Sequence, residues 1–392
     1  MNRLASPAAA LLISSLAISG WSQTQAFKRP DPAELLAEKL HPGHDRPDLM
    51  SRHTPEERNK ILAAERAGTL TTLPHWQGSF SIRDKEYHYT IVGADPTHAE
   101  TTTIPTVIVP IRLTVSDYSD DGINPLVLDA TPIVRDILHS PIFEKSNYIT
   151  GYQQFTDGML RAEFPQAAHT WHTVLSPSVY STVDVTAPPG TVRVLRAKSG
   201  KLLADIRDDS LIDDPIFQMI GNGVFAPDQF VIFVTYNALE HDAFGYHAAL
   251  FRETKTQEMV FAYSSWLVGV DDLFFIPSPD TATLSHEVAE TIHDAFLGSL
   301  SSLTLLWGDP FFHHECFQRF IEVGDAVEDA PAHVQLHEQV VGFGKQARVY
   351  TLQNEATLQW FERKDPSDAL AATYSFPDIW VLKKPAAETC IP

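Results

Sequence analysis

The sequence predicts an α+β fold in which a mixed β-sheet packs on one polar helix, with a helical lead-in at the N-terminus. Two short apolar runs, Phe230 to Tyr236 and Met259 to Leu267, are typical of buried strands. A third stretch, Leu284 to Asp294, carries polar residues at helical spacing over an apolar back, which predicts the helix. The lead-in helix is expected from Thr54, because Thr, Pro and Glu occupy the N-cap, N1 and N3 positions of a capping box there.

The first 26 residues are predicted to be a secretory signal peptide. Asn2 and Arg3 form a short polar region, Ala8 to Trp21 is mostly apolar and small, and Ala26 closes an acceptable cleavage site. The apolar run is shorter than the roughly 20 residues of a membrane span, although an uncleaved N-terminal anchor is the alternative. We therefore expect a secreted or periplasmic protein without a stable membrane span after cleavage.

Two regions are expected after the signal peptide: a helical N-terminal segment, residues 27–73, and one domain, residues 74–392. The length suffices for a large core. The formal net charge of -21 argues against a nucleic-acid partner, because phosphate binding needs a basic patch. A P-loop, a dinucleotide-binding fingerprint and a serine-hydrolase elbow are not found in the sequence, so three common enzyme classes lose support.

Cys316 and Cys390 are the two cysteines of the chain. In an oxidising compartment they can form one disulfide, which would tie the C-terminus to the segment before Glu322. Two free buried thiols are the alternative. Because the sequence has no C-x-x-C pair, we do not expect cysteine to ligate a metal ion.

Three segments between the lead-in and the polar helix have less regular patterns. Thr103 to Val115 is long and β-branched, but Pro105 and Pro110 predict an edge or interrupted strand. Phe143 to Phe164 is expected to be a helix, because its aromatic residues recur at helical spacing. Gly245 to His247 is expected in a loop between the two buried strands.

The polar helix carries residues suited to metal chemistry. His286, Glu290 and His293 fall on one face, Glu287 lies one step around the same turn, and Ser285 suits the N-cap. In an H-E-x-x-H helix two histidines bind zinc and the glutamate between them is the general base. Here Glu290 replaces the second histidine; a carboxylate ligand preserves the geometry but weakens the Lewis acidity of the ion.

A third ligand is expected from the acidic cluster Glu322-Val323-Gly324-Asp325, which follows the helix at a suitable spacing. The predicted site is thus one Zn²⁺ ion per chain, held by His286, Glu290 and Glu322. Asp294 and Asp325 are candidates for orienting a ligand histidine by accepting its other N–H, and for direct ligation. His293 is likewise a candidate for a supporting role or for direct ligation. As a fourth ligand it would close the site. Tyr246 and His247 are candidates for polarising a substrate carbonyl.

Three alternatives compete with this zinc site. An H-E-x-x-E string can arise by chance in an acidic chain, and the helix would then be an ordinary polar one. Glu290-x-x-His293 also matches the Glu-x-x-His unit of di-iron helical bundles. That site needs a second such unit, and Glu38-x-x-His41 lies in a short N-terminal helix. A His-Glu-Glu ligand set would also suit iron or manganese.

Several short motifs are distributed over most of the chain: T-L-P-H-W at Thr72 to Trp76, T-T-T-I-P at Thr101 to Pro105, G-Y-H at Gly245 to His247, L-S-H-E-V-A-E at Leu284 to Glu290 with Asp294 after it, and E-V-G-D at Glu322 to Asp325. In these motifs the chain resembles a group of secreted bacterial proteins with a zincin-like H-E-x-x-E motif. The helix motif and the acidic cluster are also similar to the pattern in phosphate-induced plant secreted proteins. The resemblance implies a zincin-like fold and a metallopeptidase-like activity. The chain departs from true zincins at Glu290, and from the metzincin pattern at His293 and Phe296.

The sequence therefore favours an exported zinc-dependent hydrolase, most simply a metalloprotease, with a peptide or protein as substrate. Glu287 would deprotonate a zinc-activated water and later pass the proton to the leaving amine. The rival hypothesis is a non-catalytic secreted binding protein whose metal site is structural or decayed. Three protein ligands plus water would favour the enzyme, and four protein ligands would favour the structural site.

Overall fold

The computed structural model describes residue 40 and residues 53–241, 243–297, 299–300, 305–308, 310–311, 316, 320–387 and 390. The expected signal peptide and the first part of the expected lead-in lie outside the described residues. The described chain is a mixed α+β structure, as the sequence predicts. Its helices are α2 (Pro55–Arg66), α3 (Val134–Leu138), α4 (Phe155–Glu163), α5 (Ser210–Asn222), α6 (Ala282–Asp294), α7 (Ala332–Gln335) and α8 (Leu358–Phe361).

The largest sheet of the described residues is built around one long strand, β3. Its path is β13 (Gly245–Arg252), β14 (Gln257–Trp266), β11 (Phe230–Tyr236), β3 (Thr101–Val115) and β4 (Leu126–Asp129), and β7 (His172–Val179) and β8 (Val183–Ala187) also pair with β3. β11 is parallel to both β3 and β14, whereas β13 is antiparallel to β14. The two apolar runs expected to be buried strands are therefore confirmed as β11 and β14.

Smaller sheets surround this one. They are the hairpin β1 (His75–Ile82) with β2 (Lys85–Val92), the sheet β12 (Ala238–Glu240), β10 (Leu202–Ile206) and β9 (Val192–Arg196), the sheet β16 (Arg348–Gln353), β15 (Leu336–Val341), β5 (Ser146–Tyr148) and β6 (Gly151–Gln153), and the pair β17 (Glu355–Ala356) with β18 (Ser375–Phe376). Short 3₁₀ turns link several of these elements, among them η5 (Asp325–Val327).

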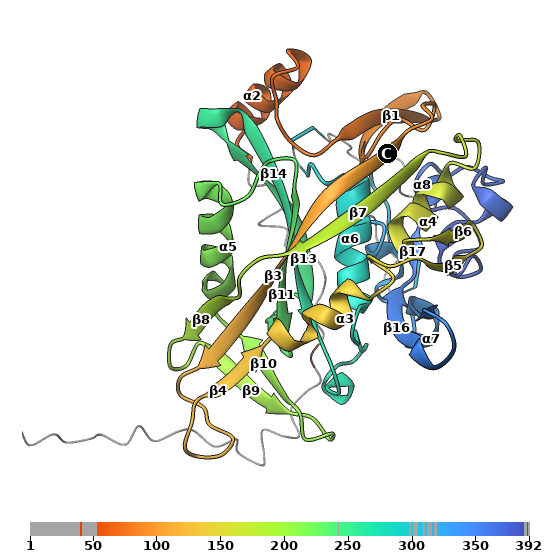
Figure 1. Ribbon diagram of the computed structural model, residues 1–392. Coiled ribbons are helices and arrows are strands. Elements are labelled where there is room, and N and C mark those ends of the chain that lie inside the picture. Colours follow the sequence, from red (N-terminus) through yellow and green to blue (C-terminus); the bar gives the residue numbers. More distant parts are fainter. Residues whose placement is uncertain are drawn as a thin grey trace, which may run out of the picture.

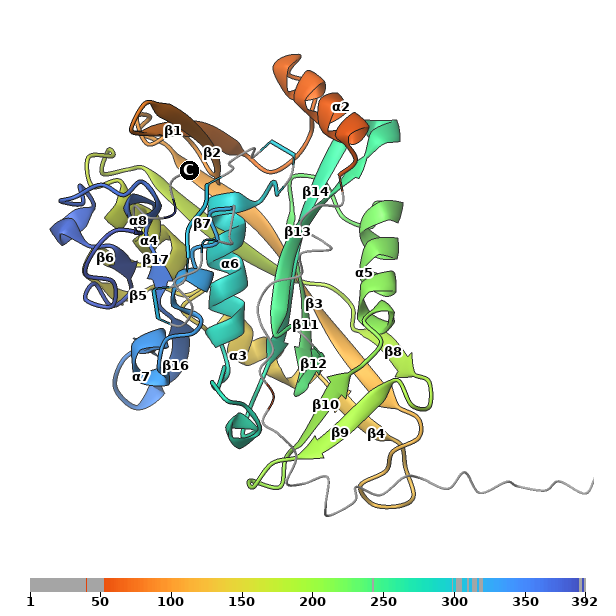
Figure 2. The same ribbon diagram turned by 180° about the vertical axis from the view of Figure 1, so that it is seen from behind.

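Successive residues of the main sheet alternate between two apolar cores, because strand side chains point to opposite faces. Ile108 and Ile232 belong to the core that contains the apolar residues of α6. Their neighbours Val109 and Phe233 belong to the core that contains the apolar residues of α5. Figure 1 and the reverse view in Figure 2 accordingly show α5 and α6 on opposite faces of the sheet. In both views α6 lies between the sheet and a second layer that includes α4, α8 and β16.

The expectation of an edge or interrupted strand at Pro105 and Pro110 is wrong, since β3 is one continuous strand and lies inside the sheet. The register explains how both prolines are accommodated. Pairing with β11 begins at Thr106, so Pro105 lies just outside that ladder. On the other side, pairing with β7 ends at Ile108 and pairing with β8 begins at Ile111, so Pro110 lies in the gap between two neighbours. A missing N–H therefore costs little at either position.

The helix expected over 143–164 is confirmed only from Phe155 to Glu163, the bounds of α4. Tyr148 and Tyr152 instead lie in β5 and β6, which form a hairpin around Gly151. Gly151 has a φ of 129°, which a residue with a side chain rarely adopts. The recurrence of aromatic residues thus spans a turn, and periodicity alone did not reveal it.

Two local expectations are confirmed. Thr54 caps α2 in a capping box with Glu57, whose backbone N–H donates to the threonine Oγ1 at 3.2 Å. Cys316 and Cys390 form a disulfide that closes 74 residues of chain. The helices of the described residues do not include one with the length and apolarity needed to cross a membrane.

Candidate metal centre

Helix α6 is buried along its whole length, although it carries two histidines and three acidic residues. The sheet covers one side of the helix, and the second layer covers the other (Figure 2). The helix begins at Ala282 with Thr281 as N-cap residue, so Ser285 is not the N-cap; its hydroxyl donates to Ala282 O at 2.8 Å. Burying ionisable groups in this way is costly unless partner groups or a cation compensate them.

Strand β13 brings a third histidine to this helix, because Gly245 to His247 forms the start of the strand and not the expected loop. His247 is paired with Ala262, which belongs to the core on the α6 face, so its imidazole points to α6. Tyr246 is paired with Tyr263 and points to the α5 face. Its hydroxyl bonds to Asp213 there, which places Tyr246 away from the cluster on α6.

The segment after Phe320 is fixed to α6 by backbone hydrogen bonds. The N–H groups of Gly324 and Asp325 donate to Glu290 Oε1 at 3.0 and 3.3 Å. The Ile321 N–H donates to Asp294 Oδ2 at 3.3 Å. These bonds hold Glu322 and Asp325 beside the helix, and they give Asp294 a positioning role toward this segment.

Two glycines allow the three segments to approach one another. A Cβ atom on Gly324 would lie 2.2 Å from His286 Nδ1. A Cβ atom on Gly245 would lie 2.6 Å from Glu287 Oε1 and 2.7 Å from the carbonyl oxygen of Tyr263. Both distances are far below van der Waals contact, so any side chain at either position would displace a polar residue of the cluster.

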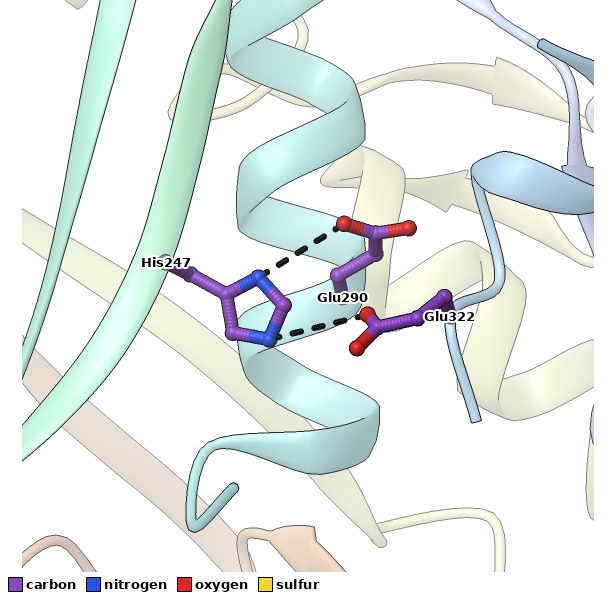
Figure 3. Close-up of side chains that lie close together, drawn as sticks. All are labelled: His247, Glu290 and Glu322. Atoms are coloured by element: carbon purple, nitrogen blue, oxygen red, sulfur yellow. Dashed lines mark ion pairs between the residues drawn. The ribbon is translucent and has the colours of Figure 1, made fainter. Parts of the chain in front are cut away.

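Two groups of three buried side chains bring their donor atoms within 4.8 Å of one another: His247, Glu290 and Glu322, and His286, Glu290 and Asp325. In the first group His247 Nδ1 lies 3.6 Å from Glu290 Oε2, and His247 Nε2 lies 3.8 Å from Glu322 Oε2 (Figure 3). In the second, His286 Nε2 lies 3.0 Å from Glu290 Oε2 and 3.5 Å from Asp325 Oδ1. Imidazole and carboxylate are the ligands that zinc, iron and manganese accept in proteins.

Comparisons with protein-family models, with curated proteins and with solved structures found no match. The function of this chain is therefore argued from the site itself.

The predicted ligands His286, Glu290 and Glu322 lie in this one cluster, but His286 and Glu322 fall in different groups that share Glu290. Asp325, a candidate both for direct ligation and for orienting a ligand histidine, completes the second group. Glu287, the predicted base, is fully buried and its Oε2 lies 3.7 Å from His247 Nδ1. The structure thus brings the predicted base and all three predicted ligands together, and adds His247 to them.

His293 lies one turn beyond Glu290 on α6 but forms a separate contact. Its Nε2 lies 2.9 Å from Glu163 Oε2 in α4, and its Nδ1 lies 2.7 Å from Ala289 O. Both ring nitrogens therefore have partners outside the two groups, and His293 belongs to neither of them.

Burial controls the protonation of the cluster. It lowers the pKa of His286 to about 3 and that of His247 to about 4, so both imidazoles are neutral near pH 7. Burial also raises the pKa of Glu290 to about 7, against the opposing effects of His247 and two backbone N–H groups. Neutral imidazoles are the form that ligates metal ions, so no proton has to leave them before an ion binds.

Gln353 in β16 contacts His286 from the side opposite the carboxylates. Its amide nitrogen lies 2.8 Å from His286 Nδ1 and 2.8 Å from the carbonyl oxygen of Gly324. In that orientation the amide donates to Nδ1, and the proton of neutral His286 is on Nε2, facing Glu290. Ligation through Nε2 requires the proton on Nδ1 instead.

Sequence reasoning missed Gln353 and the two glycines, and gave His247 a different role. The alternation of strand side chains could have assigned His247 to one face, had Gly245 to Arg252 been predicted as a strand. Gln353 carries no local signal, because its contact depends on how β16 packs against α6.

Proposed function

We propose that this protein is an exported metal-dependent hydrolase that acts on a peptide or protein. The observation that carries the proposal is the buried cluster, in which Glu287 lies beside two groups of imidazole and carboxylate donors. Zinc is the proposed ion, and the same donors suit iron or manganese. The predicted signal peptide and the disulfide support export, since disulfides persist in oxidising compartments.

The donor set fits a cation by its chemistry and by its packing. His247 Nε2 is buried, faces Glu322, and makes no hydrogen bond within the described residues. Gly245 and Gly324 leave no room for side chains of their own, so the polar groups are held at close range. Burial disfavours an ionised carboxylate, and a bound cation would stabilise those of Glu290, Glu322 and Asp325.

A bound cation would supply Lewis acidity and lower the pKa of a water molecule at the site. The other steps belong to the residues of the chain. Glu287 would accept a proton from that water and return it to the leaving amine of the substrate, as a general base and then a general acid. His247, within 3.7 Å of Glu287 Oε2, would keep that carboxylate aimed at the cluster. Gln353 would hold the ring of His286 in place.

The first test is the metal content of the purified protein, measured by elemental analysis without chelator. We expect stoichiometric metal, which the His286→Ala variant loses. A peptide library should then be cleaved by the wild-type protein and not by Glu287→Gln, which removes the base and leaves the donors of both groups intact. Glu258→Gln is a matched control, because Glu258 is a buried carboxyl in β14 outside the cluster. Full activity in Glu287→Gln would contradict the role of the base.

The burial of the cluster favours a second candidate, a structural metal site in a non-catalytic binding protein. His247, His286, Glu287, Glu290 and Glu322 are all less than 5% exposed. A catalytic site must keep a position open for water and substrate, whereas a structural site is closed by protein ligands. Bound metal that stabilises the fold, together with no cleavage of any library peptide by the wild type, would decide for this candidate.

A further inference from the structure

The cluster holds more donor side chains than one zinc ion uses. Its carboxylates are those of Glu287, Glu290, Glu322 and Asp325, its imidazoles are those of His247 and His286, and all of them are buried. A structural zinc ion takes four ligands, and a catalytic one takes three from the protein. One ion would therefore leave part of this donor set unused.

The donors form two groups that share one residue. Each of the two groups has one imidazole and two carboxylates, and Glu290 is the residue common to both. The Oε2 atom of Glu290 faces both histidines, at 3.6 Å from His247 Nδ1 and 3.0 Å from His286 Nε2. Its Oε1 atom is held by two backbone N–H groups, which fix the direction of the carboxylate. A carboxylate between two donor groups is placed to be shared by two ions.

We propose that the cluster is a dinuclear centre, with one divalent cation in the His247 group, a second in the His286 group, and Glu290 bridging them. The inference rests on the proposed function only for the claim that this cluster binds cations, and it does not require hydrolysis. Two imidazoles with four carboxylates is also the donor composition of the dinuclear carboxylate proteins. Here a strand, a helix and a loop supply the donors, and the Glu290-x-x-His293 unit is not used.

The experiment measures how many ions the full chain binds. The protein is stripped with chelator, reloaded with Zn²⁺ or Mn²⁺, and analysed by native mass spectrometry and elemental analysis. We expect two ions per chain. Glu322→Gln should lose the ion of the His247 group, Asp325→Asn that of the His286 group, and Glu290→Gln both. Glu258→Gln is the matched control and should keep two.

A second measurement needs no variant. In the Mn²⁺-loaded wild type, two ions about 3.5–4 Å apart would show exchange coupling in the electron paramagnetic resonance spectrum. One ion per chain at saturating metal would overturn the dinuclear centre and leave the proposed function standing. Two ions without exchange coupling would overturn the shared Glu290. No bound ion at all would overturn both the inference and the proposed function.

Discussion

The C-terminal end of α6 and the part around His286 and Glu290 both bury histidines near carboxylates, but the numbers of imidazoles and carboxylates differ. At the C-terminal end, His293 Nε2 meets Glu163 Oε2 at 2.9 Å, and Glu163 Oε1 accepts the Leu358 N–H at 2.8 Å. One imidazole there faces one carboxylate, and protein groups occupy the remaining positions. Around His286 and Glu290, two imidazoles face four carboxylates. At the first end the histidine and the carboxylate pair with each other, whereas the second end presents two groups of donors that could hold metal ions.

The protonation of the two histidines reflects this difference. Both are fully buried, and burial alone lowers the pKa of an imidazole. At His293 burial is the largest single cause and lowers the pKa, but Glu163, the backbone of Ala289 and Glu290 together outweigh it, and the pKa is raised. At His286 burial dominates and the pKa falls to about 3. One end of the helix therefore favours an imidazolium ion pair, and the other favours a neutral imidazole that can ligate a metal ion.

Replacing Glu290 by Gln should have the largest effect, because both groups of donors contain it. We expect metal affinity to fall by more than the ~100-fold that loss of an outer partner costs, and added metal to stop stabilising the fold. Folding energy supplied by structural zinc reaches roughly 10 kcal/mol, so the loss should be visible in thermal unfolding. Competition with a chromophoric chelator measures the affinity. Wild-type affinity in this variant would remove Glu290 from the site.

Replacing His293 by Ala should remove the buried contact with Glu163 at the C-terminal end of α6. The buried carboxylate of Glu163 is then left without its partner, which costs roughly 3–5 kcal/mol of unfolding free energy. Metal content should not change, since His293 lies in neither donor group. Urea unfolding and elemental analysis of the same sample test both halves of this prediction. Loss of metal together with unchanged stability would mean that His293 is a ligand after all.

The double variant His293→Ala with Glu163→Gln sharpens the result. It removes the carboxylate charge that Glu163 keeps in the single variant, so it should recover part of the unfolding free energy that the single variant loses.

Replacing Gly324 by Ala should strain the proposed metal cluster around His286 by packing alone. The new methyl group would overlap the His286 ring, and such overpacking costs roughly 1–3 kcal/mol. Metal affinity should fall in parallel, because His286 must move. Gly221 in α5 is the control, since its nearest atom is 3.9 Å from the added Cβ, and Ala is favoured in a helix. Equal effects of the two variants on metal affinity would argue against close packing at Gly324.

Glu258 is a buried carboxyl outside the cluster, so its replacement should leave metal binding unchanged and alter only the pH dependence of stability. Burial raises its pKa from 4.5 to about 8, so the folded protein binds its proton more tightly than the unfolded chain. Its contribution to stability is complete below about pH 4.5 and is lost as the pH rises through about 8. Glu258→Gln should remove this slope, which is at most about 1.4 kcal/mol per pH unit. Unfolding of both proteins across that range tests the sign; parallel curves would contradict the raised pKa.

The sequence predicted the elements whose signals are local. The buried run from Phe230 to Tyr236 has the bounds of β11, the capping box at Thr54 begins α2, and the polar helix is α6. The disulfide between Cys316 and Cys390 is one of the two states that the sequence left open. Each of these depends on spacing along the chain or on composition, which a single sequence displays.

The elements that the sequence predicted wrongly depend on contacts between segments that are distant in the chain. Pro105 and Pro110 are compatible with a central strand only because the partners of β3 change next to them. His247 reaches α6 because β13 pairs with β14 in one register, and a shift by one residue would present Tyr246 instead. How the acidic residues divide between His247 and His286 likewise depends on tertiary packing, which no local pattern encodes.

The donors of the cluster and their supports span the chain from Gly245 to Gln353. A growing polypeptide emerges from the ribosome N-terminal end first, so β13 and α6 are made well before β16. Until β16 packs on the helix, the ring of His286 lacks Gln353, and the partial set of donors is open to water. Under the proposed function, an ion would therefore have the complete set of surrounding contacts only after β16 has packed against α6.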